Sequence, residues 1–357
     1  MASLIQKTPD EYTVAIICAM GIERDAVRYM LDNEHQRLRK QPGDSNTYTL
    51  GELQGHNIVL VCLPGQQGNS SAATVSTNLS RSFPSVKWRL FVGVGGGVPS
   101  AKHDIRLGDV VISMPEGEYP GVVQYDLGRE TTSGFELKGF LWPIPALLRN
   151  AAQDMHSDHI GRDNKNMIAE HVETMVSKSR GLNMYRKPDK AGVRLSTDSP
   201  PLFRAIASYL NQNLPQTGAH LEREPDGPMI HYGLIASGDS VIKNTARRDE
   251  IARRVGREVL CFEMEAAGTL TEHPAIVIRG ISDYADPEKN KDWQPYASAT
   301  AAACAKELLS YIDPEEALVE KPAPAPIPKQ ELPASMVFHG RGIQNTGNIS
   351  FGGNFQC

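Results

Sequence analysis

The chain has 357 residues, 40% of them hydrophobic, which is enough for a large buried core and exceeds the usual size of a single domain. Its formal net charge of −5 gives no general attraction to nucleic acid or to an anionic membrane, so we expect neither as a partner. The N-terminus lacks a signal-peptide profile, and no apolar run approaches the roughly 20 residues that span a bilayer. We therefore expect a cytoplasmic protein that binds small molecules or other proteins.

The first part of the chain alternates buried strands with helices. A continuous apolar run at residues 13–18 predicts a strand, and the helical spacing of Ala26, Val27, Met30 and Leu31 predicts a helix after it. The elements that follow are strand 58–63, a helix ending near residue 82, strand 90–94 and strand 109–113. This alternation predicts a largely parallel sheet covered on both faces.

The middle of the chain, about residues 141–226, is polar and irregular, and we interpret it as a loop-rich excursion of the same domain. Its helical patches lie at 144–152, 168–178 and 201–210. The elements after it are strand 231–236, helix 245–255, strand 258–262, helix 265–271, strand 275–281 and an alanine-rich helix at 296–312. The predicted fold class is α/β: a single three-layer domain with a mixed, largely parallel central sheet flanked by helices.

The composition changes sharply after residue 313. Residues 314–334 include a run of alternating prolines, which predicts a semi-extended linker. Residues 335–357 are rich in Gly and Asn, carry spaced aromatic residues and lack acidic ones. This tail resembles short amyloid-type signalling segments, and it is equally consistent with a disordered tail. We thus expect an N-terminal extension at 1–11 and one folded domain at 12–313.

A glycine-rich segment at residues 93–97 follows the predicted strand 90–94, and its glycines would let a ligand approach the backbone closely. The pattern suggests a dinucleotide-binding loop. However, Val98 occupies the last glycine position of that fingerprint, Pro99 follows, and the next element is a strand rather than a helix. A plain glycine turn is the other interpretation.

Acidic side chains follow several of the predicted strands. Glu23 lies just past the first strand, and Glu265 lies where a helix begins and could accept hydrogen bonds from a vicinal diol. Ser282 and Asp283 directly follow a buried strand. Taken singly, each suits an ordinary role as a helix cap or a first-turn acid. Together with the glycines they fall at one predicted edge of one sheet, where open α/β sheets bind ligands.

In their order along the chain, these motifs resemble the nucleoside phosphorylase superfamily, in particular its methylthioadenosine/adenosylhomocysteine nucleosidase branch and related domains of fungal immune-receptor-like proteins. The motifs that carry the resemblance are Ala19-Met20 with Glu23, glycines 93–97, Ile105-Arg-Leu-Gly-Asp-Val-Val111, Gly233-Leu-Ile-Ala-Ser-Gly-Asp239, Phe262-Glu-Met-Glu-Ala266 and Ile278-Arg-Gly-Ile-Ser-Asp283. The resemblance covers about residues 12–312 apart from the middle excursion. It implies a purine N-ribosyl hydrolase that acts on an adenine nucleoside or nucleotide without a cofactor or metal, as a homo-oligomer.

The resemblance also implies roles for single residues. Asp283 would protonate the purine N7 while Ser282 orients it, and Glu23 would activate the attacking water. Glu265 would bind the 2′- and 3′-hydroxyls of a ribose that becomes oxocarbenium-like. The remaining implied contacts are Met264 against the sugar, Gly95, Gly96 and Gly97 beneath ribose and base, and Val241 beside the base.

Some positions depart from the family pattern. Phe91 stands where phosphate-using phosphorylases carry an arginine, which favours water over phosphate as the nucleophile. Val94 and Val241 replace a hydroxyl and an aromatic base-stacker, so the base and the 5′ substituent are left open. A phosphate-dependent purine nucleoside phosphorylase and an inactive nucleotide-sensing or scaffold module remain the alternatives.

Three basic residues, Lys243, Arg247 and Arg248, could contact a 5′-phosphate chain or could form a solvated helix face. The fungal domains that the chain resembles are thought to include enzymes that release adenine from adenine nucleotides, which would deplete ATP in defence or cell death. Residues 335–357 would then recruit the domain to a receptor or to further copies through stacked strands.

Overall fold

The computed structural model describes residues 5–100, 102–132, 134–163, 165–188, 227–288 and 291–314. These residues belong to one compact unit, Met1–Leu318. The helical patch predicted at 201–210, the tail predicted at 335–357 and all of the predicted linker except Pro314 lie outside the described residues.

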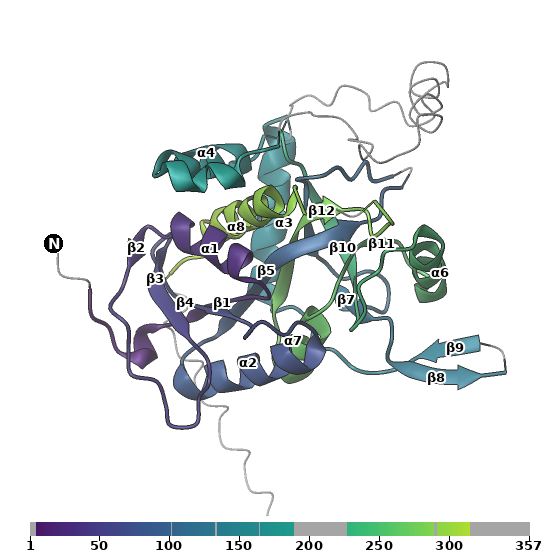
Figure 1. The fold of residues 1–357 in the computed structure, drawn as a ribbon, viewed down its shortest axis with the longest axis horizontal. Coiled ribbons are helices and arrows are strands. Elements are labelled where there is room, and N and C mark those ends of the chain that lie inside the picture. Colours follow the sequence, from purple (N-terminus) through teal and green to yellow (C-terminus); the bar gives the residue numbers. More distant parts are fainter. Residues whose placement is uncertain are drawn as a thin grey trace, which may run out of the picture. The chain divides into compact units, whose positions relative to one another are not determined.

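A ten-stranded mixed sheet forms the centre of the described chain (Figure 1), in the order β11-β10-β6-β12-β5-β1-β4-β3-β2 with β7 beside β10. Its strands are β1 (Val14–Cys18), β2 (Asn33–Glu34), β3 (Tyr48–Leu53), β4 (His56–Cys62), β5 (Trp88–Gly97), β6 (Val110–Ser113), β7 (Val122–Gln124), β10 (Ile230–Ser237), β11 (Val259–Glu263) and β12 (Ile276–Asp283). The pairs that β1 forms with β4 and β5, and β5 with β12, are parallel, whereas β6 runs antiparallel to β12. The predicted α/β class with a mixed sheet is confirmed.

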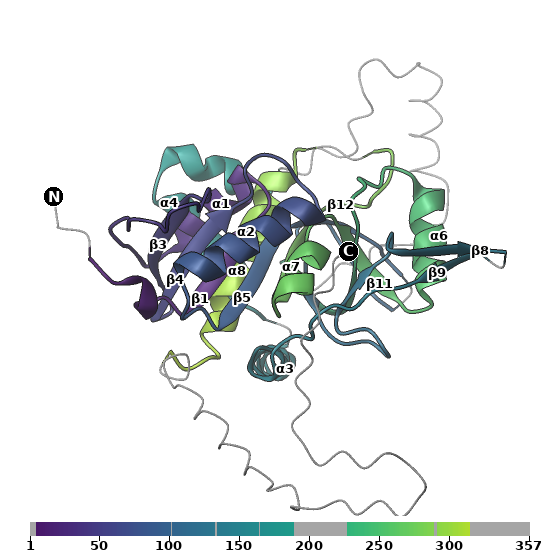
Figure 2. The same ribbon diagram turned by 90° about the horizontal axis from the view of Figure 1, so that it is seen from below.

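Helices cover both faces of the sheet (Figures 1 and 2). One face carries α1 (Gly21–Met30), α3 (Ala146–Gly161), α4 (Ile168–Ser177) and α8 (Gln294–Leu309), and the other carries α2 (Asn69–Ser82) and α7 (Ala266–Glu272). Every residue of β1 and β12 is therefore buried, which explains why both strands are mainly apolar in the sequence. The exceptions in β12 are Arg279, Ser282 and Asp283, which are polar yet buried.

The helix α8 approaches β12 unusually closely. A Cβ atom at Gly280 would collide with the backbone of Ala297, so glycine is needed at this crossing. The close packing fixes the start of α8 near the carboxyl end of β12. The segment that leads into α8 is thereby held beside Ser282 and Asp283.

Smaller elements surround this core. The helix α6 (Thr245–Val255) lies near β11, 3-10 turns occupy Pro9–Glu11 and Arg180–Tyr185, and a hairpin of β8 (Gly128–Thr131) and β9 (Gly134–Leu137) projects from the body (Figures 1 and 2). The hairpin was not predicted, because its strands are only four residues long and β8 has no apolar residue.

The glycine-rich segment is a strand and not the loop predicted from the sequence. β5 continues through Gly97, pairing in parallel with β12 and then, at Gly96 and Gly97, antiparallel with Phe262 and Cys261 of β11. A Cβ atom at Gly95 would lie 3.1 Å from the carbonyl oxygen of Phe262. Because glycine has no side chain, β5, β11 and β12 can pack closely where the sheet folds back on itself.

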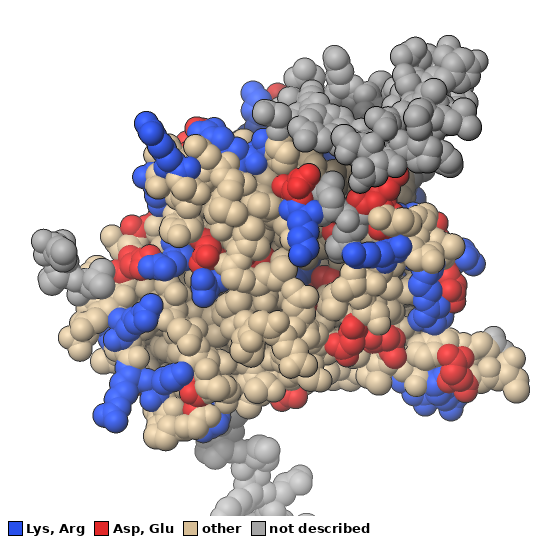
Figure 3. Space-filling view, viewed as in Figure 1, with Lys and Arg blue, Asp and Glu red and all other residues tan. Residues whose placement is uncertain are grey.

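The surface shows no continuous basic area on the face drawn in Figure 3, where acidic and basic side chains are interspersed. Such a mixture does not concentrate the positive potential that binds a polyanion. Among the described helices, none combines the length and the apolar character needed to cross a bilayer.

Candidate active site

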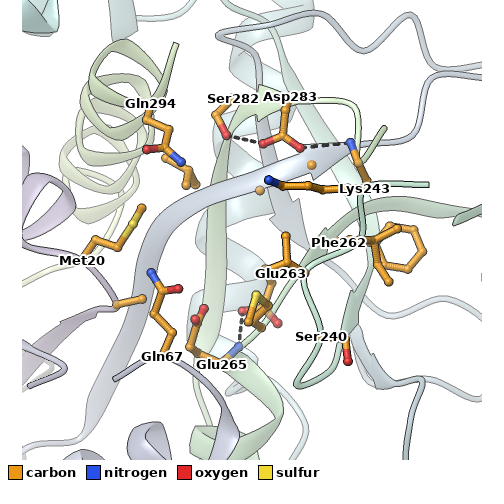
Figure 4. A pocket seen from close by; sticks show the side chains of 18 of the residues that line it. Met20, Gln67, Ser240, Lys243, Phe262, Glu263, Glu265, Ser282, Asp283 and Gln294 are labelled. Carbon is orange, nitrogen blue, oxygen red and sulfur yellow. Dashed lines mark hydrogen bonds between the residues drawn. The ribbon is translucent and has the colours of Figure 1, made fainter. Parts of the chain in front are cut away.

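A cavity of about 280 Å³ opens where β1, β5, β11 and β12 end, and most of the predicted site residues line it (Figure 4). The predicted residues on its surface are Glu23, Gly95, Gly96, Val241, Lys243, Met264, Glu265, Ser282 and Asp283. Gly97, Arg247 and Arg248 do not line it. Gly97 instead faces the side chains of Ile281 and Ile105.

The Glu23 carboxylate is held by three backbone N–H groups. Its Oε2 accepts hydrogen bonds from the N–H groups of Ala19 and Met20 at 2.9 and 2.8 Å, and its Oε1 accepts one from Val94 at 2.8 Å. The side chain thus caps α1 and also faces the cavity. Glu23 can therefore be both an acid in the first turn of a helix and a residue of the candidate site. Burial raises the pKa of Glu23, while the nearby Arg279 and the backbone donors act to lower it.

A buried ion pair lies next to these carboxylates. The Arg279 guanidinium, with an exposed fraction of 0%, donates a hydrogen bond to Oε2 of Glu263 at 2.5 Å and lies 4.6 Å from the ring centre of Phe91. A side chain at Gly93 would collide with this guanidinium. No role in the site was predicted for Arg279 or Glu263 from the sequence. An arginine within an apolar strand nevertheless indicates a buried charge, which needs a buried partner of opposite charge.

The surroundings of Glu265 strongly raise the pKa of its carboxyl group. It is 6% exposed, and burial, together with the charge of Glu263, raises its pKa to about 8, against the opposing effect of Arg279. It occupies the N-cap position of α7 without a side-chain capping hydrogen bond. Its carboxyl group therefore does not serve the helix and lines the cavity instead.

The raised pKa of Glu265 predicts a pH-dependent stability difference between the wild type and Glu265→Gln. Between about pH 5 and pH 8 the folded protein keeps the Glu265 proton that the unfolded chain has lost, so stability falls as pH rises through this window. Glutamine cannot titrate. Urea unfolding at several pH values should show a steeper loss of the free energy of unfolding in the wild type. Parallel curves for the two proteins would contradict the raised pKa.

Asp283 and Ser282 lie at the other end of the cavity (Figure 4). Asp283 is 4% exposed; the Ser282 hydroxyl donates to its Oδ2 at 2.8 Å, and the N–H of Ala285 donates to its Oδ1 at 3.0 Å. The pairing register of β12 shifts between Ile281 and Asp283, opposite Gly96. This irregularity brings the aspartate over the glycine backbone, where a larger residue would meet its Oδ1 atom.

Several lining residues were missed by the sequence reasoning: Met20, Gln67, Phe262, Lys291 and Gln294. Phe262 is 5% exposed and packs edge-on against Tyr125, at 5.6 Å between ring centres. It offers an aromatic wall for a base, although the predicted position for such a group is Val241. The sequence carried no signal for this wall, because it depends on β11 closing against β5.

Comparisons with known proteins show which family the chain resembles. The family model of the phosphorylase superfamily matches residues 13–310. A nucleotide-binding leucine-rich repeat (NLR)-like protein of Hyaloscypha variabilis is 41% identical over 86% of this chain and 30% of its own length, and the ATP nucleosidase Cap17 of Escherichia coli is 23% identical over 84% and 51%. The chain thus spans from about a third to about half of these relatives.

A solved structure shares the fold. The methylthioadenosine/adenosylhomocysteine nucleosidase of Streptococcus pneumoniae, in complex with 8-aminoadenine, superposes with a TM-score of 0.54 at 20% identity, covering 84% of this chain and 100% of that one. Because the family model matches residues 13–310, most of the chain, the chain belongs to the phosphorylase superfamily.

Proposed function

We propose that the protein hydrolyses the N-glycosidic bond of an adenine nucleoside or nucleotide. The observation that carries this proposal is the gathering of Glu23, Glu265 and Asp283, far apart in the sequence, on one cavity. The names of the relatives support it, since nucleosidases recur among them.

Each of these residues has a separate role in the proposed reaction. Glu23 takes a proton from a water molecule, whose oxygen bonds to C1′ as the C1′–N9 bond breaks. The bonding electron pair passes to the base, which Asp283 neutralises by donating a proton to N7. Glu265 holds the 2′- and 3′-hydroxyls and stabilises the positive charge that develops on the ribose. The products are free adenine and the ribose compound.

Water fits this cavity better than phosphate as the nucleophile. A phosphate attacking C1′ would lie next to Glu23, Glu263 and Glu265, all buried and close to one another. The neighbouring cation, Arg279, is already paired with Glu263. Repulsion between a phosphate dianion and the buried carboxylates of Glu23 and Glu263 at low dielectric disfavours its binding there.

The finer form of the proposal is hydrolysis of ATP, releasing adenine and depleting the nucleotide during fungal defence or cell death. The relative named ATP nucleosidase supports this substrate. We also propose that the protein is a cytoplasmic homo-oligomer and that residues 335–357, which lie outside the described part of the chain, recruit a receptor or further copies.

The test is a substrate panel. Purified protein is mixed with adenosine, methylthioadenosine, inosine and ATP, with and without phosphate, and free base is measured by chromatography. We expect release of adenine without phosphate. Release that strictly requires phosphate would establish phosphorolysis, and no base from any substrate would indicate a binding module without turnover.

A further inference from the structure

Charge is unevenly distributed over the cavity. The carboxylates Glu23, Glu263 and Glu265 gather around Arg279, whereas Lys243 and Lys291 lie on exposed parts of the lining. Within the described part of the chain, neither lysine forms a hydrogen bond or an ion pair. Two ammonium groups therefore border the cavity with their charges available to a ligand.

The neighbouring basic residues behave differently. Arg247 pairs with Glu250 at 2.8 Å, and Arg248 pairs with Asp249 at 2.8 Å and donates to the carbonyl oxygen of Tyr284. Both arginines lie off the cavity surface. The two arginines thus lie outside the cavity and are paired, whereas Lys243 and Lys291 lie on its lining and are unpaired within the described part of the chain.

Two amide side chains accompany the lysines. Figure 4 shows Gln67 and Gln294 on one side of the cavity, opposite Phe262, and Lys243 extends into the cavity toward the side that carries Gln294. Lysine ammonium groups and side-chain amides are donors that bind phosphate oxygens.

The stereochemistry of a nucleoside connects this region with the proposed reaction. The 2′- and 3′-hydroxyls lie on one face of the ribose, and the base and the 5′ carbon lie on the other. Figure 4 shows Glu265 and Asp283 at opposite ends of the cavity, so a nucleoside with its hydroxyls at Glu265 and its base at Asp283 would span it. Its 5′ carbon would lie on the face of the ribose turned away from Glu265, from which a phosphate chain can reach the exposed lining that carries Lys243 and Lys291.

We propose that Lys243 and Lys291, assisted by Gln67 and Gln294, form a subsite for the 5′-phosphate chain of a nucleotide and make the protein prefer nucleotides over uncharged nucleosides. This inference rests on the proposed hydrolase function. It assigns the preference for nucleotides to the exposed lining of the cavity. It also gives Lys243 a role in binding phosphate that Arg247 and Arg248, which lie off the cavity, do not share.

The test compares ATP with adenosine in charge-reversed variants. In Lys243→Glu/Lys291→Glu, we expect kcat/KM for ATP to fall by about tenfold to hundredfold, mainly through KM, and that for adenosine to change less than about threefold. Lys243→Arg/Lys291→Arg should keep the preference. Arg247→Glu is the control, since it reverses one positive charge off the cavity, and it should leave the ATP-to-adenosine ratio unchanged.

Two results would overturn the subsite: an unchanged ATP-to-adenosine ratio in the double glutamate variant, or an equal fall of that ratio in Arg247→Glu. Calorimetric binding of ATP and adenosine to the same proteins keeps this test independent of turnover. If the wild type releases no base from either compound, the proposed hydrolysis fails. The subsite is then tested by binding alone, and it fails if ATP binding is insensitive to reversal of both lysines or falls equally in Arg247→Glu.

Discussion

Replacing Asp283 by asparagine is expected to lower kcat for adenine release by about 10²- to 10⁴-fold, the usual contribution of a general acid. Asparagine has nearly the same shape and can still accept the hydrogen bond from the N–H of Ala285. Its amide cannot give a proton to N7, so the base would have to leave as an anion. The measurement is the steady-state rate of adenine release at saturating substrate.

The control for this experiment is Asp249→Asn, which removes an equally charged group from the exposed surface of α6. It should keep the wild-type rate. Thermal unfolding should show both variants folded, with midpoints within a few degrees of the wild type. An Asp283→Asn protein that retains more than about a tenth of the wild-type kcat would remove the aspartate from the mechanism.

The arrangement of the cavity suits a reaction that separates charge. Negative charge develops on the departing base, near Asp283 and the Ser282 hydroxyl that donates to it. Positive charge develops on the sugar, near Glu265 and Glu23. Because the Glu23 carboxylate is buried, water screens its attraction for the sugar only weakly. In the proposed reaction, the two ends of the cavity would thus stabilise the two halves of the breaking bond.

The core of the fold was predictable because its strands are buried on both faces. β1 and β12 lie between two helical layers, so their apolar runs are long and bounded by turns. β3 was missed, and so was the closure of β11 against β5. The pairing of β11 with β5 joins residues that are far apart in the sequence and depends on the glycines of β5, so it leaves no local pattern. The same glycines were therefore interpreted as a loop.

The candidate site was only partly predictable, for a related reason. Carboxyl ends of parallel strands meet at one sheet edge, so the strand-end residues Glu23 and Asp283 could be placed together from their positions alone. Arg279 is buried in the middle of β12, and its partner Glu263 comes from β11. Recognising that pair required the order of the strands in space, which periodicity does not give.

The ion pair between Arg279 and Glu263 carries the second large prediction. Replacing Arg279 by methionine is expected to lower the free energy of unfolding by about 3 to 5 kcal/mol, because it leaves the Glu263 carboxylate buried without its counter-charge. Equilibrium unfolding in urea measures this loss. The double variant Arg279→Met/Glu263→Gln should be more stable than Arg279→Met alone, since glutamine is neutral and still accepts the N–H of Glu265.

The same substitution should shift the pH dependence of activity. Arg279 acts to lower the pKa of both Glu23 and Glu265, so removing it raises both pKa values further. A proposed base must be ionised to accept a proton from water, and the acidic limb of the kcat/KM profile should therefore move to higher pH. The charge-retaining variant Arg279→Lys should show a smaller shift. A profile unmoved in a folded Arg279→Met protein would mean that this guanidinium supports the fold without setting the charge of the cavity.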